Sequence, residues 1–211
     1  MPIPVLAEVS VASNLIPAFI GVRKFRALHK SMKILTVLCI LACVQEAGEF
    51  VLGVLRITNY FLSDYYRLIE VSMLCTVFWF SVKNVRMRWI LVVLGVTFAA
   101  LWTIDLLMFS DPRHMNSVMA LIARAFLIIM SAVTLWSFTH EDGLLLTERP
   151  VFWLVAGVTL YSTGTIVILG LSNYLLGLGS TYFVAAWHVN WCLLIAANLF
   201  YTKGLLCRAT V

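Results

Sequence analysis

The chain has 211 residues, of which 62% are hydrophobic and 12% are charged, and its net charge is +5. Soluble domains carry charge on roughly 25% of their residues, so this composition excludes a soluble globular protein. Most basic residues lie at the ends of apolar segments, which is typical of topology signals in membrane proteins and argues against a nucleic-acid partner. We therefore predict an all-α, polytopic membrane protein whose main surroundings are the lipid bilayer.

Charged and turn-forming clusters divide the chain into seven apolar segments, each near the roughly 20 residues that cross a bilayer. No basic residue precedes the apolar part of the first segment, so we expect an uncleaved first helix and no signal peptide. Short loops join the segments, which makes residues 1–211 a single seven-helix transmembrane domain. In chain order, the expected spans are residues 4–22, 33–56, 63–82, 88–109, 115–138, 151–174 and 180–202.

The distribution of Lys and Arg predicts the orientation of the helices. Eleven basic residues lie near helix ends on one side of the membrane and three on the other. By the positive-inside rule, the N-terminus faces outward and the C-terminus faces the cytoplasm.

A short internal similarity suggests a repeat. Asn59-Tyr60 and Asn173-Tyr174 both follow an apolar segment at its predicted outer end. This similarity favours a 3+1+3 arrangement of two parallel repeats, residues 1–84 and 115–205, with the helix of residues 88–109 as a linker. Parallel repeats of this kind occur in transporters. Chance recurrence of so short a motif is the alternative.

Ionisable side chains occur within five of the predicted helices, all in the half of the membrane that faces outward. A charge that faces lipid costs a few kcal/mol or more, so these groups are expected to face inward, pair with one another or line water. Glu46 and Glu49 lie one helical turn apart, and Arg67 and Glu70 share a helix face by their spacing of three. We therefore predict a polar cavity in the outer half of the bundle, walled by aromatic side chains. The candidate ligand-binding residues are Glu46, Glu49, Arg67, Glu70, Asp105, Arg124, Tyr161, Trp187, His188, Asn190 and Trp191.

Two interpretations of these charges remain open. The carboxyl groups of Glu46, Glu49, Glu70 and Asp105 outnumber the two arginines of this layer, so at least one acid is expected to hold a proton or bind a cation. A static network of buried ion pairs that fixes helix register is the alternative.

Sequence motifs for catalysis are missing from the chain. The last predicted helix has no lysine at mid-depth, which excludes a retinal protein, and there is no GxSxG, P-loop or GxGxxG sequence. Neither an ExxH pair nor an HxxxH pair occurs in the membrane segments, so no metal can be assigned. We expect no enzyme and no cofactor, although hydrolysis by two carboxylates within the membrane stays open.

Three stretches, NLIPAFIGVRKFRAL, NYFLSDYYRLIEVSMLCTVFWF and RPVFWLVAGVTLYSTGTIVILGL, carry a resemblance to known proteins. They resemble a group of small bacterial seven-helix membrane proteins of unassigned function, which implies a multi-pass protein of the bacterial inner membrane. The 3+1+3 layout is also similar to PQ-loop and SWEET-type transporters. However, Pro17 is followed by Ala18, where those families have glutamine, so their substrates are not transferred to this chain. The motif positions shared with the bacterial group are Pro17, Glu46, Tyr66, Glu70, Trp153 and Tyr161.

Three functions are compatible with this pattern. The predicted charged layer lies on one side only, which favours a receptor- or sensor-like module that binds a small molecule or ion from outside. A small-solute or ion-coupled transporter is the first alternative, and it requires polar groups that continue through the mostly apolar inner half. A non-catalytic accessory subunit that binds a membrane-protein partner is the second alternative.

Overall fold

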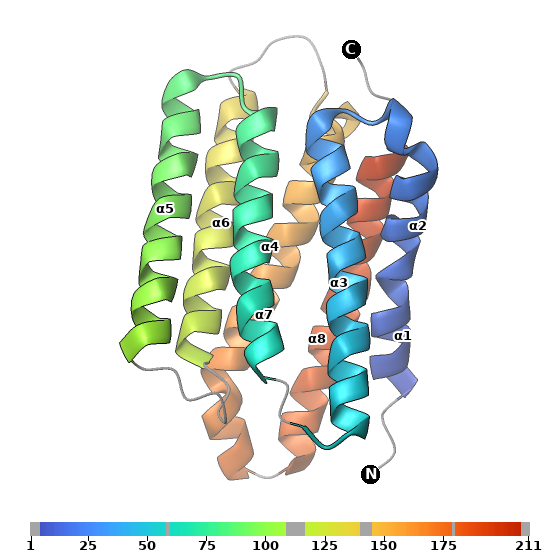
Figure 1. The fold of residues 1–211 in the computed structure, drawn as a ribbon, viewed down its shortest axis with the longest axis vertical. Coiled ribbons are helices and arrows are strands. Elements are labelled where there is room, and N and C mark those ends of the chain that lie inside the picture. The colour runs from blue at the N-terminus through green and yellow to red at the C-terminus, as the bar shows by residue number, and fades with distance from the viewer. Residues whose placement is uncertain (1–4, 58–59, 109–116, 140–144, 179, 208–211) are drawn as a thin grey trace.

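The structure, a computed structural model, describes residues 5–57, 60–108, 117–139, 145–178 and 180–207 (Figure 1). All regular secondary structure in these ranges is helical, which confirms the predicted all-α class. The long helices are α1 (Val5–Ser13), α2 (Leu15–Lys24), α3 (Lys30–Val54), α4 (Tyr60–Ser81), α5 (Val85–Met108), α6 (Ser117–Thr139), α7 (Pro150–Leu178) and α8 (Ser180–Leu206), and two short 3₁₀ helices are η1 (Phe25–Ala27) and η2 (Leu146–Glu148).

The helices have the lengths and compositions of membrane spans. Within the described residues, six segments are long and apolar enough to cross a bilayer. One is Val5–Ala27, which joins α1, α2 and η1. The others comprise most or all of α3, α5, α6, α7 and α8. Helix α4 is 22 residues long, but Asp64, Arg67 and Glu70 fall within every 18-residue stretch of it. The chain is therefore built as a multi-pass membrane protein, in which α4 keeps three charged residues within its membrane-length stretch.

The first span is broken at Asn14, between α1 and α2. Pro17 has no backbone N–H, so the carbonyl of Ser13 lacks its usual helical donor. The Asn198 side chain of α8 donates from Nδ2 to Ser13 Oγ and to Asn14 Oδ1, each at 2.8 Å. These bonds satisfy polar groups at the break and connect the first span to the last, as the low-dielectric membrane interior requires.

The helices form a ring. Around it, α3 packs on α4, α4 on α6, α6 on α7, α7 on α8, and α8 on both α1 and α2, while α2 packs back on α3. Helix α5 lies outside this ring and packs on α4 and α6 (Figure 1). A peripheral α5 is compatible with the linker helix that the repeat predicts, but the repeat itself stays a prediction, and Asn59 lies outside the described residues.

The contact between α7 and α8 is the most extensive of the bundle. A Cβ atom added to Gly157 of α7 would lie 3.1 Å from the Ala197 carbonyl oxygen of α8 and 2.8 Å from the Tyr201 ring. A Cβ atom added to Gly164 would overlap the Leu193 side chain. Small residues of this kind allow membrane helices to approach closely.

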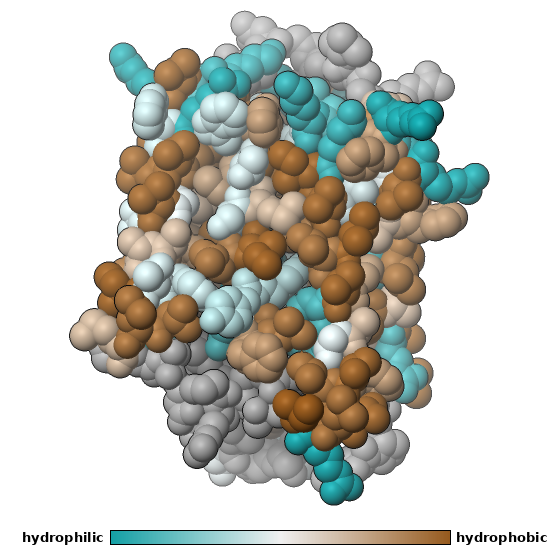
Figure 2. Space-filling view, viewed as in Figure 1, coloured by the Kyte–Doolittle hydropathy of each residue, from teal (hydrophilic) through white to brown (hydrophobic). Residues whose placement is uncertain are grey.

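Basic side chains gather at one end of the bundle, which we call the basic end. Figure 2 shows hydrophilic residues along this rim and a largely hydrophobic band beside it, on the face in view. Helix α1 begins at the opposite end, whereas α8 ends at the basic end (Figure 1). Which end faces the cytoplasm stays a prediction from the positive-inside rule. The described basic residues at this end are Arg23, Lys24, Arg26, Lys30, Lys33, Lys83, Arg86, Arg88, Arg149 and Lys203.

Candidate functional site: a charged cavity inside the helix ring

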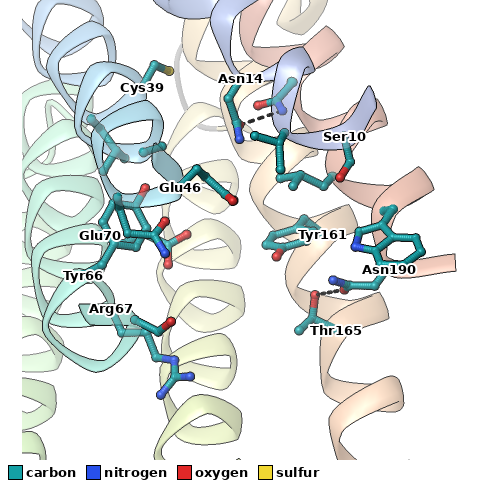
Figure 3. Close-up of a pocket in the computed structure, with 18 of the residues that line it drawn as sticks. Ser10, Asn14, Cys39, Glu46, Tyr66, Arg67, Glu70, Tyr161, Thr165 and Asn190 are labelled. Carbon is teal, nitrogen blue, oxygen red and sulfur yellow. Dashed lines mark hydrogen bonds between the residues drawn. The ribbon is translucent and has the colours of Figure 1, made fainter. Parts of the chain in front are cut away.

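A cavity of about 350 Å³ lies inside the ring, with α3, α4 and α6 on one side and α1, α7 and α8 on the other (Figure 3). We call it the central cavity. Helix α5 contributes no lining residue. The polar and aromatic side chains that line it are Ser10, Asn14, Gln45, Glu46, Glu49, Ser63, Tyr66, Arg67, Glu70, Arg124, Tyr161, Thr165, Trp187, Asn190, Trp191, Asn198 and Tyr201.

Most of the residues predicted to bind a ligand do line the central cavity. The structure brings together Glu46, Glu49, Arg67, Glu70, Arg124, Tyr161, Trp187, Asn190 and Trp191 from five helices. The structure thus shows that these side chains line one cavity. Ligand binding by them stays a prediction.

Two predicted site residues, Asp105 and His188, are not among the lining residues. Asp105 lies on α5, and that helix sits outside the ring. His188 lies 2.7 Å, measured from Nδ1, from the Val184 carbonyl oxygen of its own helix, and its ring packs on Trp191 with centroids 5.0 Å apart. The sequence gives the depth of these two side chains, whereas the direction in which they point depends on how the helices assemble.

Glu70 and Arg124 form the central ion pair of the cavity. Arg124 Nη1 donates to Glu70 Oε1 at 2.8 Å, and the two side chains are only 13% and 12% exposed. The Arg124 guanidinium carbon also lies 4.8 Å from the centroid of the Tyr161 ring. One cation thereby joins α4, α6 and α7 through a charge-assisted hydrogen bond and a cation–π contact.

Arg67 pairs with a residue that the sequence analysis did not select. Its Nη1 donates to Asp64 Oδ1 at 2.5 Å, one turn earlier in α4. The Trp102 indole of α5 donates to the Asp64 carbonyl oxygen at 3.3 Å, which fixes this turn against its neighbour. The spacing of three between Asp64 and Arg67 is the signal that identifies this pair in the sequence.

Glu46 and Glu49 differ in their surroundings although they lie one turn apart. Glu49 Oε1 accepts hydrogen bonds from Gln45 Nε2, at 2.5 Å, and from Ser63 Oγ. Glu46 lines the cavity, and the residues that the structure describes provide it with no hydrogen bond or ion pair. In Figure 3 its side chain points from α3 into the space that faces Tyr161.

The cavity region therefore has more acids than bases. Glu46, Glu49, Asp64 and Glu70 contribute four carboxyl groups, against the two guanidinium groups of Arg67 and Arg124. Of the four acids in the prediction, Glu46, Glu49 and Glu70 line the cavity, whereas neither Asp105 nor Asp64 does. Whether the excess of acids is balanced by protons or by a cation stays a prediction.

Neutral polar groups line the side of the cavity formed by α1, α7 and α8. Thr165 Oγ1 of α7 donates to Asn190 Oδ1 of α8 at 3.0 Å (Figure 3). Asn14 and Asn198 are buried and joined to each other by a hydrogen bond. These groups add amide and hydroxyl donors and acceptors to the charged side chains opposite.

The central cavity extends beyond the outer half in which it was predicted. On α3 it runs from Leu35 to Glu49, which is roughly 21 Å at 1.5 Å per residue. Tyr201, which also lines it, is five residues from the end of α8 at the basic end. Asn198 is the signal in the sequence for this extension, since it interrupts an apolar stretch.

The central cavity offers charge, hydrogen bonds and aromatic surface. Within the described ranges, no group of three or more His, Cys, Asp or Glu side chains is placed to hold a metal ion. Cys39 lines the cavity as a free thiol. The arrangement is suited to recognising a small polar or charged molecule through complementary charges and aromatic contacts.

Neither a protein-family model, nor a curated protein, nor a solved structure matches this chain. The resemblance to small bacterial seven-helix proteins stays an expectation.

Proposed function

We propose that the protein binds a small molecule or ion in the central cavity, as a receptor- or sensor-like module of the membrane. The observation that carries the proposal is the carboxyl group of Glu46, which lines an internal cavity of about 350 Å³ and has no partner among the described residues. This volume lies at the lower end of the roughly 300–1,000 Å³ of small-molecule sites. The proposal assigns no catalytic step to the cavity.

The alternative of a purely structural ion-pair network explains only part of this geometry. Arg124 pairs with Glu70, and Arg67 pairs with Asp64. Such pairs fix helix positions, as a structural network would. They leave Glu46 facing open space at membrane depth, where an unbalanced charge is costly. A ligand bound beside Glu46 explains why its carboxyl group faces the cavity, whereas the ion-pair network alone does not.

A transporter is the second candidate, and one observation favours it. Asn14, Asn198 and Tyr201 extend the polar lining toward the basic end. Alternating access requires a substrate path that reaches both sides of the membrane, with the site between them. Measuring flux of an identified ligand across proteoliposomes separates the two candidates, since a sensor binds the ligand without moving it.

Native mass spectrometry of the protein, released from mild detergent, tests the proposal. We expect a bound small mass in the wild type and its loss in Ala42→Phe, because Ala42 lines the cavity and the added ring fills it. Ala47→Phe is the matched control, since Ala47 is on the exposed face of the same helix. A bare wild-type mass, unchanged by incubation with small-molecule extracts, contradicts the proposal and favours the accessory-subunit alternative.

A further inference from the structure

We infer that the ligand of the central cavity is a small organic monocation, a quaternary or protonated amine, held between Glu46 and the aromatic side chains of α7 and α8. This inference rests on the proposed function and names the chemical class that the cavity selects. Three features carry it: the unbalanced carboxyl group of Glu46, the aromatic surface opposite it, and the fact that both arginines already pair with acids.

The charge balance favours a cation. Among the described residues, three carboxyl groups and two guanidinium groups line the cavity, and each guanidinium donates to a carboxylate of the protein, Arg67 to Asp64 beside the cavity and Arg124 to Glu70. An anionic ligand would have to compete with Asp64 for Arg67 or with Glu70 for Arg124. A cationic ligand meets Glu46 without displacing an existing contact. It also reduces the repulsion between Glu46 and Glu49, which lie one turn apart.

The aromatic lining favours an organic cation over a bare metal ion. Tyr161, Trp187 and Trp191 all line the central cavity. Aromatic faces attract quaternary and protonated amines, and Trp is the strongest such surface. Tyr161 already takes part in one cation–π contact, with Arg124. Metal ions prefer several oxygen, nitrogen or sulfur ligands, and the described residues place no group of three such acidic, histidine or cysteine side chains together.

The geometry places the two kinds of group on opposite sides of the space. Figure 3 shows Glu46 reaching in from α3 and Tyr161 standing across from it on α7. The Trp187 ring is held edge-on by Phe183, with centroids 6.1 Å apart, and the Trp191 ring by His188. Both indoles therefore pack against a neighbouring ring of α8 while they line the cavity.

Isothermal titration of the protein in nanodiscs with choline as the probe tests this inference. The comparison ligands are 3,3-dimethylbutan-1-ol, which has the same shape without the charge, and betaine, which adds a carboxylate. We expect choline to bind about tenfold or more tightly than either, because only choline carries an unbalanced positive charge. Glu46→Gln is expected to weaken choline binding about tenfold, while the matched control Glu8→Gln, at an exposed acid of α1, leaves it unchanged.

The outcomes separate this inference from the proposed function. If the neutral alcohol or betaine binds as well as choline, and Ala42→Phe abolishes that binding, the cavity is a ligand site but not a cation site. If no probe binds and native mass spectrometry also shows a bare protein, the proposed function itself fails. If choline binds equally well to Glu46→Gln and to the wild type, and circular dichroism shows both folded, the role given to Glu46 is wrong.

Discussion

The two sides of the central cavity differ in the kinds of side chain that they carry. The side formed by α3, α4 and α6, the charged wall, carries Glu46, Glu49, Arg67, Glu70 and Arg124. The side formed by α1, α7 and α8, the neutral wall, carries amide, hydroxyl and aromatic side chains. Within one cavity, the charged side chains thus belong to one set of helices and the uncharged polar side chains mostly to the other.

This difference shows how a membrane bundle accommodates buried charges. The charged wall pairs Glu70 of α4 with Arg124 of α6 at 2.8 Å. The neutral wall brings α7 and α8 together at Gly157 and Gly164, where a larger residue would collide with the opposite helix. Close approach at small residues also occurs on the charged wall, where a Cβ atom added to Gly48 of α3 would lie 2.9 Å from the Leu62 side chain of α4.

The largest expected effect comes from breaking the central ion pair. Arg124→Gln leaves Glu70 as an uncompensated buried charge and should lower the free energy of unfolding by about 3–5 kcal/mol. Glu70→Gln should cost a similar amount, and the double variant should recover part of the loss. Reversible unfolding in mixed micelles measures these differences.

The control for the ion pair is Arg23→Gln, because Arg23 is exposed at the basic end and its loss should change stability little. If the double variant is as unstable as the sum of the two single variants, Glu70 and Arg124 are not coupled, and the charged wall is not held by this pair.

The second effect tests the close packing of the neutral wall. Gly157→Ala places a methyl group against the Ala197 carbonyl and the Tyr201 ring, and we expect a loss of about 1–3 kcal/mol. Gly170→Ala is the control in the same helix, because an added Cβ there meets nothing within 4 Å. Equal stability of the two variants in thermal unfolding would contradict the close approach of α7 and α8.

A smaller effect is expected at the break in the first span. Asn198→Leu removes the hydrogen bonds to Ser13 and Asn14. Interhelical hydrogen bonds in membranes average about 0.6 kcal/mol each, so the loss should be about 1 kcal/mol. Thr103→Val is the control, since the Thr103 hydroxyl is exposed and bonds only within α5 among the described contacts. A destabilisation no larger than that of the control would mean that α8 does not support the break.

The smallest expected effect on stability is that of Glu46→Gln. Glu46 makes no ion pair with any described residue, so removing its charge should leave the unfolding free energy of the empty protein within about 0.5 kcal/mol, or raise it. The same unfolding assay measures it. A loss as large as that of Glu70→Gln would show that Glu46 belongs to the structural network and would remove the main support for a ligand.

The sequence predicts the helices well because each span must be apolar over a fixed length. The segment of residues 33–56 corresponds to α3, and the segment of residues 180–202 corresponds to α8, which continues to Leu206. The break at Asn14 was not predicted, although Pro17 is a visible cause of it. Whether a proline bends, breaks or leaves a helix straight depends on its neighbours in the bundle; here Asn198 of α8 donates to the Ser13 and Asn14 side chains at the break.

The site was predictable in depth but not in direction. Position along the chain places Glu46, Glu70 and Arg124 at one level of the membrane, and the structure brings them to one cavity. The exclusion of Asp105 from the cavity lining, by contrast, depends on which helices form the ring. That arrangement is set by side-chain packing between distant segments, which hydropathy along the chain does not describe.

The most direct measurement is the reactivity of a thiol placed inside the cavity. In a variant whose five native cysteines are serine, Ala42→Cys places a thiol one turn from Glu46, and Ala47→Cys places one on the exposed face of α3. Two methanethiosulfonate reagents are compared, one with a positively charged trimethylammonium group and one with a negatively charged sulfonate group. We predict that the trimethylammonium reagent modifies the Ala42→Cys variant about tenfold faster than the sulfonate reagent does. The Ala47→Cys variant is expected to react with neither. A thiol at position 42 that is unreactive to both reagents, or that favours the sulfonate, would contradict an accessible cavity selective for cations.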